Sequence, residues 1–243
     1  MEIKGKTALV TGAAKRVGRS IALELAKKGA GIVLHYHRSE EEARDTSSEI
    51  KSLGVRCLAV KADLSVASDV KKLALEAAKL SGNVDILVNS ASLYFKTPVE
   101  TATEADWDQL IDANLKAPFL LSTEIGRAMK KKNGGKIINI ADWSGFRPYK
   151  DFSAYCTSKG GLITLTKSLA RDLAPNVCVN AIAPGPILMP PDMSDHEKEA
   201  IAKTTALGRW GKPEDIGHAV TFLIESDYVN GVVLVVDGGR SIV

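Results

Sequence analysis

Cysteine is scarce in this chain: its 243 residues include Cys57, Cys156 and Cys178, with no Cys-x-x-Cys pair and no cluster of cysteine and histidine. An odd number of widely spaced cysteines predicts free thiols in a reducing compartment. A chain of this length buries enough surface to fold without disulfides or a structural metal. We therefore expect no metal site.

Positively and negatively charged residues nearly balance, and the sequence has no long apolar run. The formal net charge is +3 and 25% of the residues are charged, which is too balanced to indicate a nucleic-acid partner. No apolar run approaches the roughly 20 residues that a membrane-spanning helix needs. A strand-like pattern begins within about five residues of the amino end, so we expect no signal peptide. These absences predict a cytoplasmic protein without a membrane partner.

Short β-branched runs alternate with longer amphipathic stretches along the whole chain. The runs predict strands at Thr7–Thr11, Ile32–Tyr36, Val55–Val60, Ile86–Asn89, Lys136–Ile140, Val177–Ile182 and Val232–Val236. The stretches between them predict helices at Val17–Lys28, Glu40–Leu53, Val66–Leu80, Trp107–Lys132 and Ala154–Leu173. Several strands are apolar on both faces, as in parallel sheets covered by helices. The sequence predicts one α/β domain, a doubly wound parallel sheet over residues 1–243.

One long irregular stretch runs from Pro184 to about Lys203, with four prolines and a polar Asp-His-Glu-Lys-Glu run. It follows a strand, so it lies at the carboxyl edge of the sheet, where ligands bind in open α/β folds. We expect residues of about 184–205 to form either a substrate lid or a mobile surface loop.

The first strand runs into Gly12-Ala13-Ala14-Lys15-Arg16-Val17-Gly18 and then a helix. Glycine permits a tight turn and lets backbone N–H groups approach a pyrophosphate, while the helix start adds partial positive charge. A turn that follows a strand and opens a helix predicts dinucleotide binding at Gly12, Arg16, Val17 and Gly18.

The end of the second strand indicates which dinucleotide is bound. An NAD site places a carboxylate there for the ribose 2′-OH. This chain reads His35-Tyr36-His37-Arg38-Ser39, with no acid before Glu40. Arg38 and Ser39 offer a cation and a hydroxyl to a 2′-phosphate, and Lys15 or Arg16 adds charge, so NADP is predicted. The alternative is that Arg38 is a solvated surface charge.

Six segments resemble, in order and spacing, the motifs of the short-chain dehydrogenase/reductase family: Thr11-Gly12, Asn89-Ser90-Ala91-Ser92, Asp112-Ala113-Asn114-Leu115, Tyr155-Cys156-Thr157-Ser158-Lys159, Pro184-Gly185 and Asp237-Gly238-Gly239. The resemblance implies a Rossmann-like sheet of about seven strands and a homotetramer. It implies catalytic roles for Tyr155, Lys159 and Asn114, with Asn114 at a water relay. It extends the cofactor-binding set to His37, Asp63, Leu64, Asn89, Ala91, Ser92, Tyr155, Lys159, Pro184, Gly185 and Ile187.

Three positions depart from the family pattern. Arg16 replaces the middle glycine of the first turn, Ser92 replaces the last glycine of the Asn-Asn-Ala-Gly motif, and Asp142 stands thirteen residues before Tyr155, where the family has serine. These departures resemble the pteridine reductase branch, in which an aromatic residue at the position of Tyr94 packs on the pterin. The resemblance implies a substrate site of Arg16, Ser92, Tyr94, Asp142 and Tyr155.

The residues themselves predict the proton chemistry. Tyr155 and Lys159 share one helix face. An ammonium about 4 Å from the phenol, at an effective dielectric near 20, contributes about 4 kcal/mol. We therefore expect the pKa of Tyr155 to move from about 10 toward 7. Protonated Asp142 could donate to a ring nitrogen, and ionised Asp142 could accept from an N–H group. Alternatively, Asp142 or Ser144 only caps a turn.

The sequence thus predicts hydride transfer from NADPH to a C=N bond of a pterin or dihydrofolate-type substrate. The first alternative is a 3-oxoacyl-acyl-carrier-protein reductase or another carbonyl reductase, which the family-wide motifs favour and Asp142 and Arg16 oppose. The second alternative is an NADPH-binding protein that has lost catalysis and acts by interaction, which Tyr155, Lys159 and Asn114 oppose.

Overall fold

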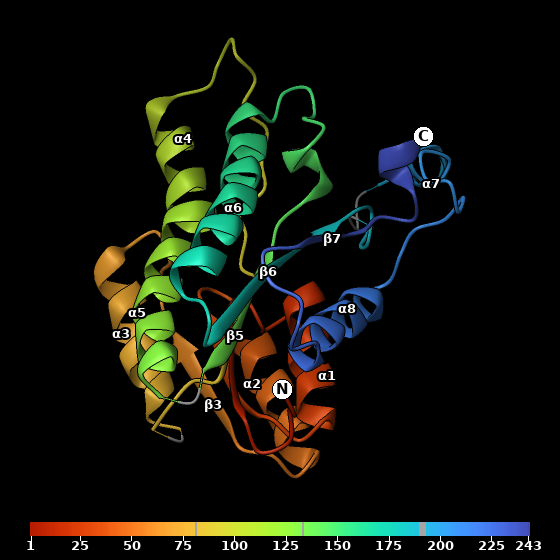
Figure 1. Cartoon of the computed structure of the whole chain (residues 1–243). Coiled ribbons are helices and arrows are strands. Elements are labelled where there is room, and N and C mark those ends of the chain that lie inside the picture. Colours follow the sequence, from red (N-terminus) through yellow and green to blue (C-terminus); the bar gives the residue numbers. More distant parts are fainter. Residues whose placement is uncertain (81, 133, 190–192) are drawn as a thin grey trace.

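The computed structural model describes residues 1–80, 82–132, 134–189 and 193–243. Within these residues, seven parallel strands form one sheet in the order β3-β2-β1-β4-β5-β6-β7 (Figure 1). The strands are β1 (Thr7–Val10), β2 (Gly31–Tyr36), β3 (Cys57–Lys61), β4 (Ile86–Asn89), β5 (Gly135–Ile140), β6 (Val177–Pro184) and β7 (Val233–Val236). Every predicted strand is present, and each end lies within two residues of its predicted place. The predicted doubly wound sheet is confirmed.

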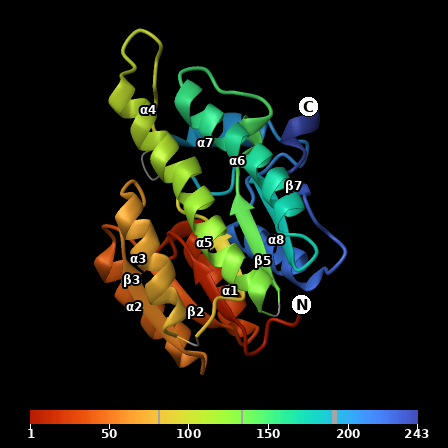
Figure 2. The same ribbon diagram turned by 60° about the vertical axis from the view of Figure 1, so that its left-hand side comes forward.

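Helices cover both faces of the sheet. One layer contains α1 (Arg16–Lys27), α2 (Glu40–Ser52) and α8 (Pro213–Glu225). The opposite layer contains α3 (Ala67–Ala78), α5 (Ala117–Lys131) and α6 (Ser153–Asp172), which lie together in Figure 2. Among the described residues, no helix is long and apolar enough to cross a membrane.

Successive side chains of a strand point to opposite faces of the sheet, and this explains why each strand is apolar throughout. Ala8 and Val10 of β1 belong to the core under α1, whereas Leu9 between them belongs to the core under α5. Leu9 and Val10 are fully buried. Burying one such side chain stabilises the fold by about 1.5–3 kcal/mol, so helices on both faces make a continuous apolar run favourable.

The helix predicted at Trp107–Lys132 is longer and is not uniform. It begins as α4 (Glu104–Ile111), where Thr103 and Asp106 form a capping box. It continues through a π-helical turn, η1 (Asp112–Lys116), into α5. Such π turns are rare and occur frequently at functional sites. This one carries Asn114.

The prediction that the stretch after Pro184 is irregular to about Lys203 was wrong over its second half. Helix α7 (Asp195–Ala202) occupies it, because Ser194 accepts a hydrogen bond from the Glu197 amide while Glu197 accepts from the Ser194 amide. This reciprocal capping compensates for a helix without buried residues. Residues 190–192 of the predicted loop lie outside the described residues.

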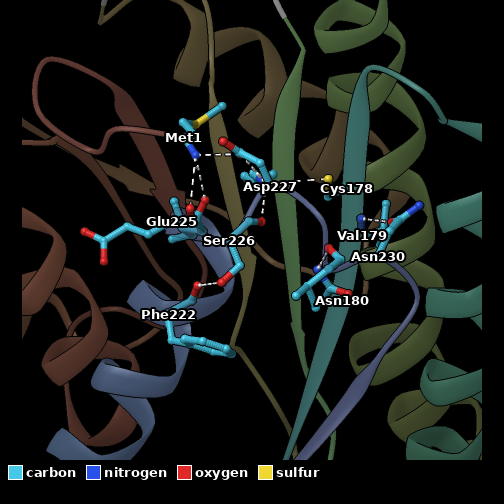
Figure 3. A network of polar contacts seen from close by, with 12 residues as sticks. Met1, Cys178, Val179, Asn180, Phe222, Glu225, Ser226, Asp227 and Asn230 are labelled. Atoms are coloured by element: carbon cyan, nitrogen blue, oxygen red, sulfur yellow. Dashed lines mark hydrogen bonds and ion pairs between the residues drawn. The ribbon is translucent and has the colours of Figure 1, made fainter.

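Polar groups join the chain's amino end to the amino edge of the sheet, where Figure 3 shows a hydrogen-bond network. Buried Lys136 donates to the Ser226 carbonyl at 2.7 Å and pairs with Asp227 at 3.0 Å. The Met1 amino group lies 2.6 Å from the same Asp227 oxygen. The hydrogen bond from the Met1 amino group lowers the pKa of Asp227 most, and Lys136 lowers it further, to about 2. A cavity of about 550 Å³ lies here, at the end of the strands opposite to the predicted site.

Candidate active site

The β1–α1 turn packs directly against the end of β4. Thr11 Oγ1 accepts hydrogen bonds from the Ser90 and Ala91 amides at 2.9 and 3.0 Å. Gly12 has φ +66°, and a Cβ there would lie 2.9 Å from the Ala91 Cα. A Cβ on Gly18 would lie 2.3 Å from the Gly12 carbonyl oxygen. Both positions therefore require glycine, as the predicted dinucleotide turn does.

Sequence reasoning missed the part of His35 in this turn. The Gly12 amide donates to His35 Nδ1 at 3.1 Å, so the ring proton lies on Nε2, which donates to the Ala62 carbonyl at 3.2 Å. Burial lowers the pKa of His35 to about 4, so the ring is neutral. The histidine thereby joins the β1 turn to the end of β3. The only sequence signal was a histidine inside a strand.

Two predicted phosphate ligands have guanidinium groups without a hydrogen bond or ion pair among the described residues, although Arg38 has the charge of Asp63 nearby. Arg16 and Arg38 are exposed, and neither makes an ion pair or a side-chain hydrogen bond with another described residue. Arg16 has φ +56°, the left-handed conformation that glycine adopts easily. Lys15, in contrast, pairs with Glu42 at 3.3 Å. The cations at this edge that remain for a phosphate are therefore the two arginines.

The other predicted residues of this edge follow β2 and β3. Ser39 is the N-cap residue of α2, and its hydroxyl makes no capping bond. His37 Nε2 lies 3.5 Å from Asp63 Oδ2, and the other Asp63 oxygen accepts two bonds from Ser65. Leu64 is buried. Asp63 thus holds His37 and its own turn in place, and Ser39 keeps a free hydroxyl at the edge.

Asn89 does not present its side chain to this edge. Its amide nitrogen donates to Ser122 Oγ at 3.1 Å and to Asn139 Oδ1 at 2.8 Å, inside the core. Both donors of the Asn89 amide are thus satisfied within the protein, whereas its Oδ1 is buried without a hydrogen-bond partner among the described residues. The predicted cofactor contact of Asn89 stays a prediction. Ala91 is half-buried. Ser92 is exposed, and its hydroxyl donates a hydrogen bond to the Leu93 carbonyl at 3.3 Å.

Asn114 holds the segment after β4. Its oxygen accepts from the Leu93 amide at 2.8 Å, and its nitrogen donates to the Leu93 carbonyl at 2.9 Å and to Ser158 at 3.2 Å. The amide therefore orients the strand end that carries Ser92 and Tyr94. Its predicted water-relay role stays a prediction.

Asp142, Tyr155 and Lys159 meet at the carboxyl end of β5. The Tyr155 hydroxyl donates to Asp142 Oδ2 at 2.9 Å. Asp142 Oδ1 accepts from the Ser144 amide at 2.7 Å and thereby caps η2 (Trp143–Gly145). One carboxylate therefore serves both the turn and the phenol. Asp142 faces the tyrosine, as the substrate-site prediction requires.

The prediction that Lys159 lowers the pKa of Tyr155 was wrong. Burial, and then the charge and hydrogen bond of Asp142, raise the pKa of Tyr155 well above 10. Lys159 donates to the Ile140 carbonyl at 2.9 Å and lies 5.7 Å from the phenol ring centroid. Burial lowers the pKa of Lys159 itself to about 8. The spacing correctly placed both groups on one helix face, but it could not show the carboxylate beside them.

Tyr94 borders this centre and is 59% exposed. Its ring stacks on Phe152 at 4.7 Å and meets Tyr155 edge-on at 4.8 Å between centroids. At the carboxyl end of β6, the Gly185 amide donates to the Val236 carbonyl, and a Cβ on Gly185 would lie 2.7 Å from the Asp237 Cα. Pro184 ends β6, while Val17 and Ile187 pack partly buried on the α1 core.

Comparison with known proteins agrees with this geometry. The model of the short chain dehydrogenase family matches residues 6–200. The 3-oxoacyl-[acyl-carrier-protein] reductase FabG of Staphylococcus aureus is 37% identical over 239 residues, which cover 96% of this chain and 97% of that protein. The FabG protein of Staphylococcus epidermidis is 36% identical, with coverage of 96% and 98%.

Solved structures agree as well. A blue fluorescent protein from a metagenomic library, in complex with NADPH, has a TM-score of 0.92 and 32% identity, and the match covers 99% of both chains. A dehydrogenase/reductase from Sinorhizobium meliloti has a TM-score of 0.91 and 37% identity, with coverage of 98% and 97%. The predicted family is confirmed, and the pteridine reductase branch stays a prediction. This chain belongs to the short-chain dehydrogenase family of NAD(P)-dependent oxidoreductases.

Proposed function

We propose that this enzyme uses NADPH to reduce a C=N bond in a pterin or dihydrofolate-type substrate. The observation that carries the proposal is the Asp142 carboxylate 2.9 Å from the Tyr155 hydroxyl, where the family has a serine. An ionised carboxylate only accepts hydrogen bonds, so it cannot donate to a substrate carbonyl as a serine does. The Asp142 carboxylate therefore suits a heterocycle that presents N–H groups as hydrogen-bond donors.

The carboxyl ends of β1 and β2 fit a cofactor with a 2′-phosphate. Arg38 has Asp63 as a charged neighbour but makes no ion pair or side-chain hydrogen bond with a described residue, and the Ser39 hydroxyl makes no capping bond. Glu40, the first acid after β2, pairs with Arg44 at 2.7 Å. The glycines of the first turn would let backbone amides approach the pyrophosphate. Bound NADPH supplies the hydride; the residues named here would hold its phosphates.

Tyr155 is the proposed proton donor to the ring nitrogen. The reduction adds a hydride to carbon and a proton to nitrogen, and the Tyr155 phenol is the O–H donor that meets Asp142 at this centre. Lys159, with a pKa of about 8, is largely protonated at neutral pH and stabilises the phenolate left behind. Asp142 already accepts from the Ser144 amide and the Tyr155 hydroxyl, and in this proposal its carboxylate also accepts from substrate N–H groups.

A 3-oxoacyl-acyl-carrier-protein reductase is the second candidate. It is supported by 37% identity to the FabG protein of Staphylococcus aureus over nearly the whole chain. It is opposed by Asp142, because a carbonyl substrate needs a donor at that position. A protein without catalysis is opposed by the assembled Tyr155, Lys159 and Asn114.

Steady-state oxidation of NADPH with dihydrobiopterin, dihydrofolate and an acetoacetyl thioester tests the proposal. We expect turnover of at least one of the two heterocycles and little of the thioester. Turnover of the thioester alone would establish the second candidate instead. Tight NADPH binding without turnover of any of the three would favour a non-catalytic role.

The homotetramer implied by the family resemblance stays a proposal. Sedimentation velocity at micromolar concentration tests it, and a single species with the mass of one or two chains would contradict it.

A further inference from the structure

A cluster of aromatic rings surrounds the Tyr155 phenol. Tyr94 contacts Tyr155 and stacks on Phe152, with centroid distances of 4.8 and 4.7 Å. Tyr149 lies 6.0 Å from Phe152 and 5.4 Å from Trp143. These five rings, which we call the aromatic wall, lie beside Asp142, and Tyr94 is the exposed ring among them.

Arg240 lies over the Trp143 and Tyr149 rings of the aromatic wall. Its guanidinium carbon lies 4.5 Å from the Trp143 ring centroid and 5.8 Å from that of Tyr149. The arginine begins η3 (Arg240–Ile242), the turn after β7. Buried Asp237 holds this turn by accepting from the Gly239 amide at 2.8 Å and the Ser241 amide at 2.7 Å. The position of Arg240 is therefore set by backbone contacts.

The N–H groups of Arg240 have no acceptor. Within the residues that the structure describes, the side chain makes no hydrogen bond and has no carboxylate within 4.0 Å, although it is half-buried. The nearest acid of the proposed centre, Asp142, accepts from Ser144 and Tyr155 instead. Stacking on Trp143 engages only the face of the guanidinium, so its N–H edge remains for a ligand.

An unpaired guanidinium in a half-buried setting favours a carboxylate, which it binds through two parallel hydrogen bonds. We propose that Arg240 binds a carboxylate on the side chain of the substrate. The substrate class is then a planar nitrogen heterocycle whose ring lies at Asp142 beside the exposed Tyr94 and whose side chain carries an anionic end to Arg240. This inference rests on the proposed function and narrows it toward folate-type substrates.

Kinetics with a matched pair of substrates test the role of Arg240. Dihydrofolate carries carboxylates on its side chain and dihydrobiopterin does not. Charge-assisted hydrogen bonds contribute about 1.5–3 kcal/mol, so Arg240→Gln should raise the KM for dihydrofolate about 10- to 100-fold. The KM for dihydrobiopterin should stay within about twofold, since it lacks the anion. Arg240→Lys should recover only part of the loss, because an ammonium lacks the planar fork.

Arg147→Gln is the matched control, because this exposed arginine donates only to the backbone carbonyl of Val243. It should leave both KM values unchanged. Equal changes for both substrates in Arg240→Gln, or none, would overturn the proposed carboxylate site.

Calorimetry with folate, added to the enzyme–NADP⁺ complex, separates this inference from the proposed function. If the wild type reduces neither heterocycle, the proposed function fails. Folate binding that weakens at least tenfold in Arg240→Gln would still support the carboxylate site. Folate binding that is unaffected, or that is absent from the wild type, would overturn it.

Discussion

At the scale of single residues, Asp142 determines which chemistry the centre can perform. Its two oxygens contact groups in different parts of the chain, the Ser144 amide and the Tyr155 hydroxyl. Burial raises the pKa of the phenol most, and the charge and hydrogen bond of Asp142 raise this pKa further. A carboxylate beside a phenol stabilises the protonated phenol, so the tyrosine keeps its proton until a basic nitrogen arrives.

Asp142→Ser tests this role. A serine can still cap the turn, but it accepts less strongly from substrate N–H groups. We expect kcat/KM for the pterin to fall about 10- to 100-fold, the equivalent of one charge-assisted hydrogen bond. Activity with an acetoacetyl thioester should stay the same or rise. Steady-state kinetics with both substrates measure this, and a parallel loss for both would contradict a selective role for the carboxylate.

Arg38 is the residue that we expect to select NADPH over NADH. Its guanidinium has the charge of Asp63 nearby but makes no hydrogen bond or ion pair with a described residue, so Arg38→Ala should cost few protein contacts. The Kd for NADPH should rise about 10- to 100-fold, while that for NADH should change less than about threefold. Arg44→Ala, which removes an exposed arginine paired with Glu40, is the control. Equal losses for the two dinucleotides would contradict the assignment.

At the scale of elements, the turns and helix ends carry most of the site. The π-helical turn η1 carries Asn114, the β1–α1 turn carries Arg16, and η2 carries the cap made by Asp142. Sequence periodicity predicted the helices next to these turns. It missed α7, because the Ser194–Glu197 capping box and not an apolar face supports that helix. A search for capping motifs in the polar run would have found it.

Arg16 keeps the β1–α1 turn in a left-handed conformation that costs a non-glycine residue about 1–2 kcal/mol. Arg16→Gly relieves this cost but adds freedom to the unfolded chain, so the free energy of unfolding should rise by up to about 1 kcal/mol. Arg16→Ala keeps the strain and should give no gain. Both variants should bind NADPH more weakly.

Urea unfolding and NADPH titration of these two variants check the prediction. Lower stability of the glycine variant than of the alanine variant would show that the conformation is not strained. Unchanged NADPH affinity in both would remove Arg16 from the cofactor site.

At the scale of the whole molecule, neutral His35 links the first turn to the third strand, and stability should depend on its protonation. Its pKa is about 4 in the folded protein and near 6.5 in an unfolded chain. Between these values the unfolded chain binds more protons, so stability is lost as the pH falls from 6.5 to 4. The shift corresponds to about 3 kcal/mol.

Urea unfolding of the wild type and of His35→Gln at pH 7 and pH 4.5 measures this dependence. Glutamine can accept and donate but does not titrate, so the variant should lose much less stability at the lower pH. His218→Gln, which replaces an exposed histidine, should behave as the wild type does. Identical pH dependence in all three proteins would exclude His35 as the source.

The sequence alone determined the parallel sheet, the family and the shared helix face of Tyr155 and Lys159, because periodicity and motif spacing are local properties. Only the tertiary structure decided the high pKa of Tyr155, the attachment of His35 to Gly12 and the place of Arg240 on Trp143. Each of these depends on groups that are distant in the chain and close in space. Burial and hydrogen bonding between such groups leave no periodic pattern in the sequence, so their effect on charge and reactivity is determined by packing.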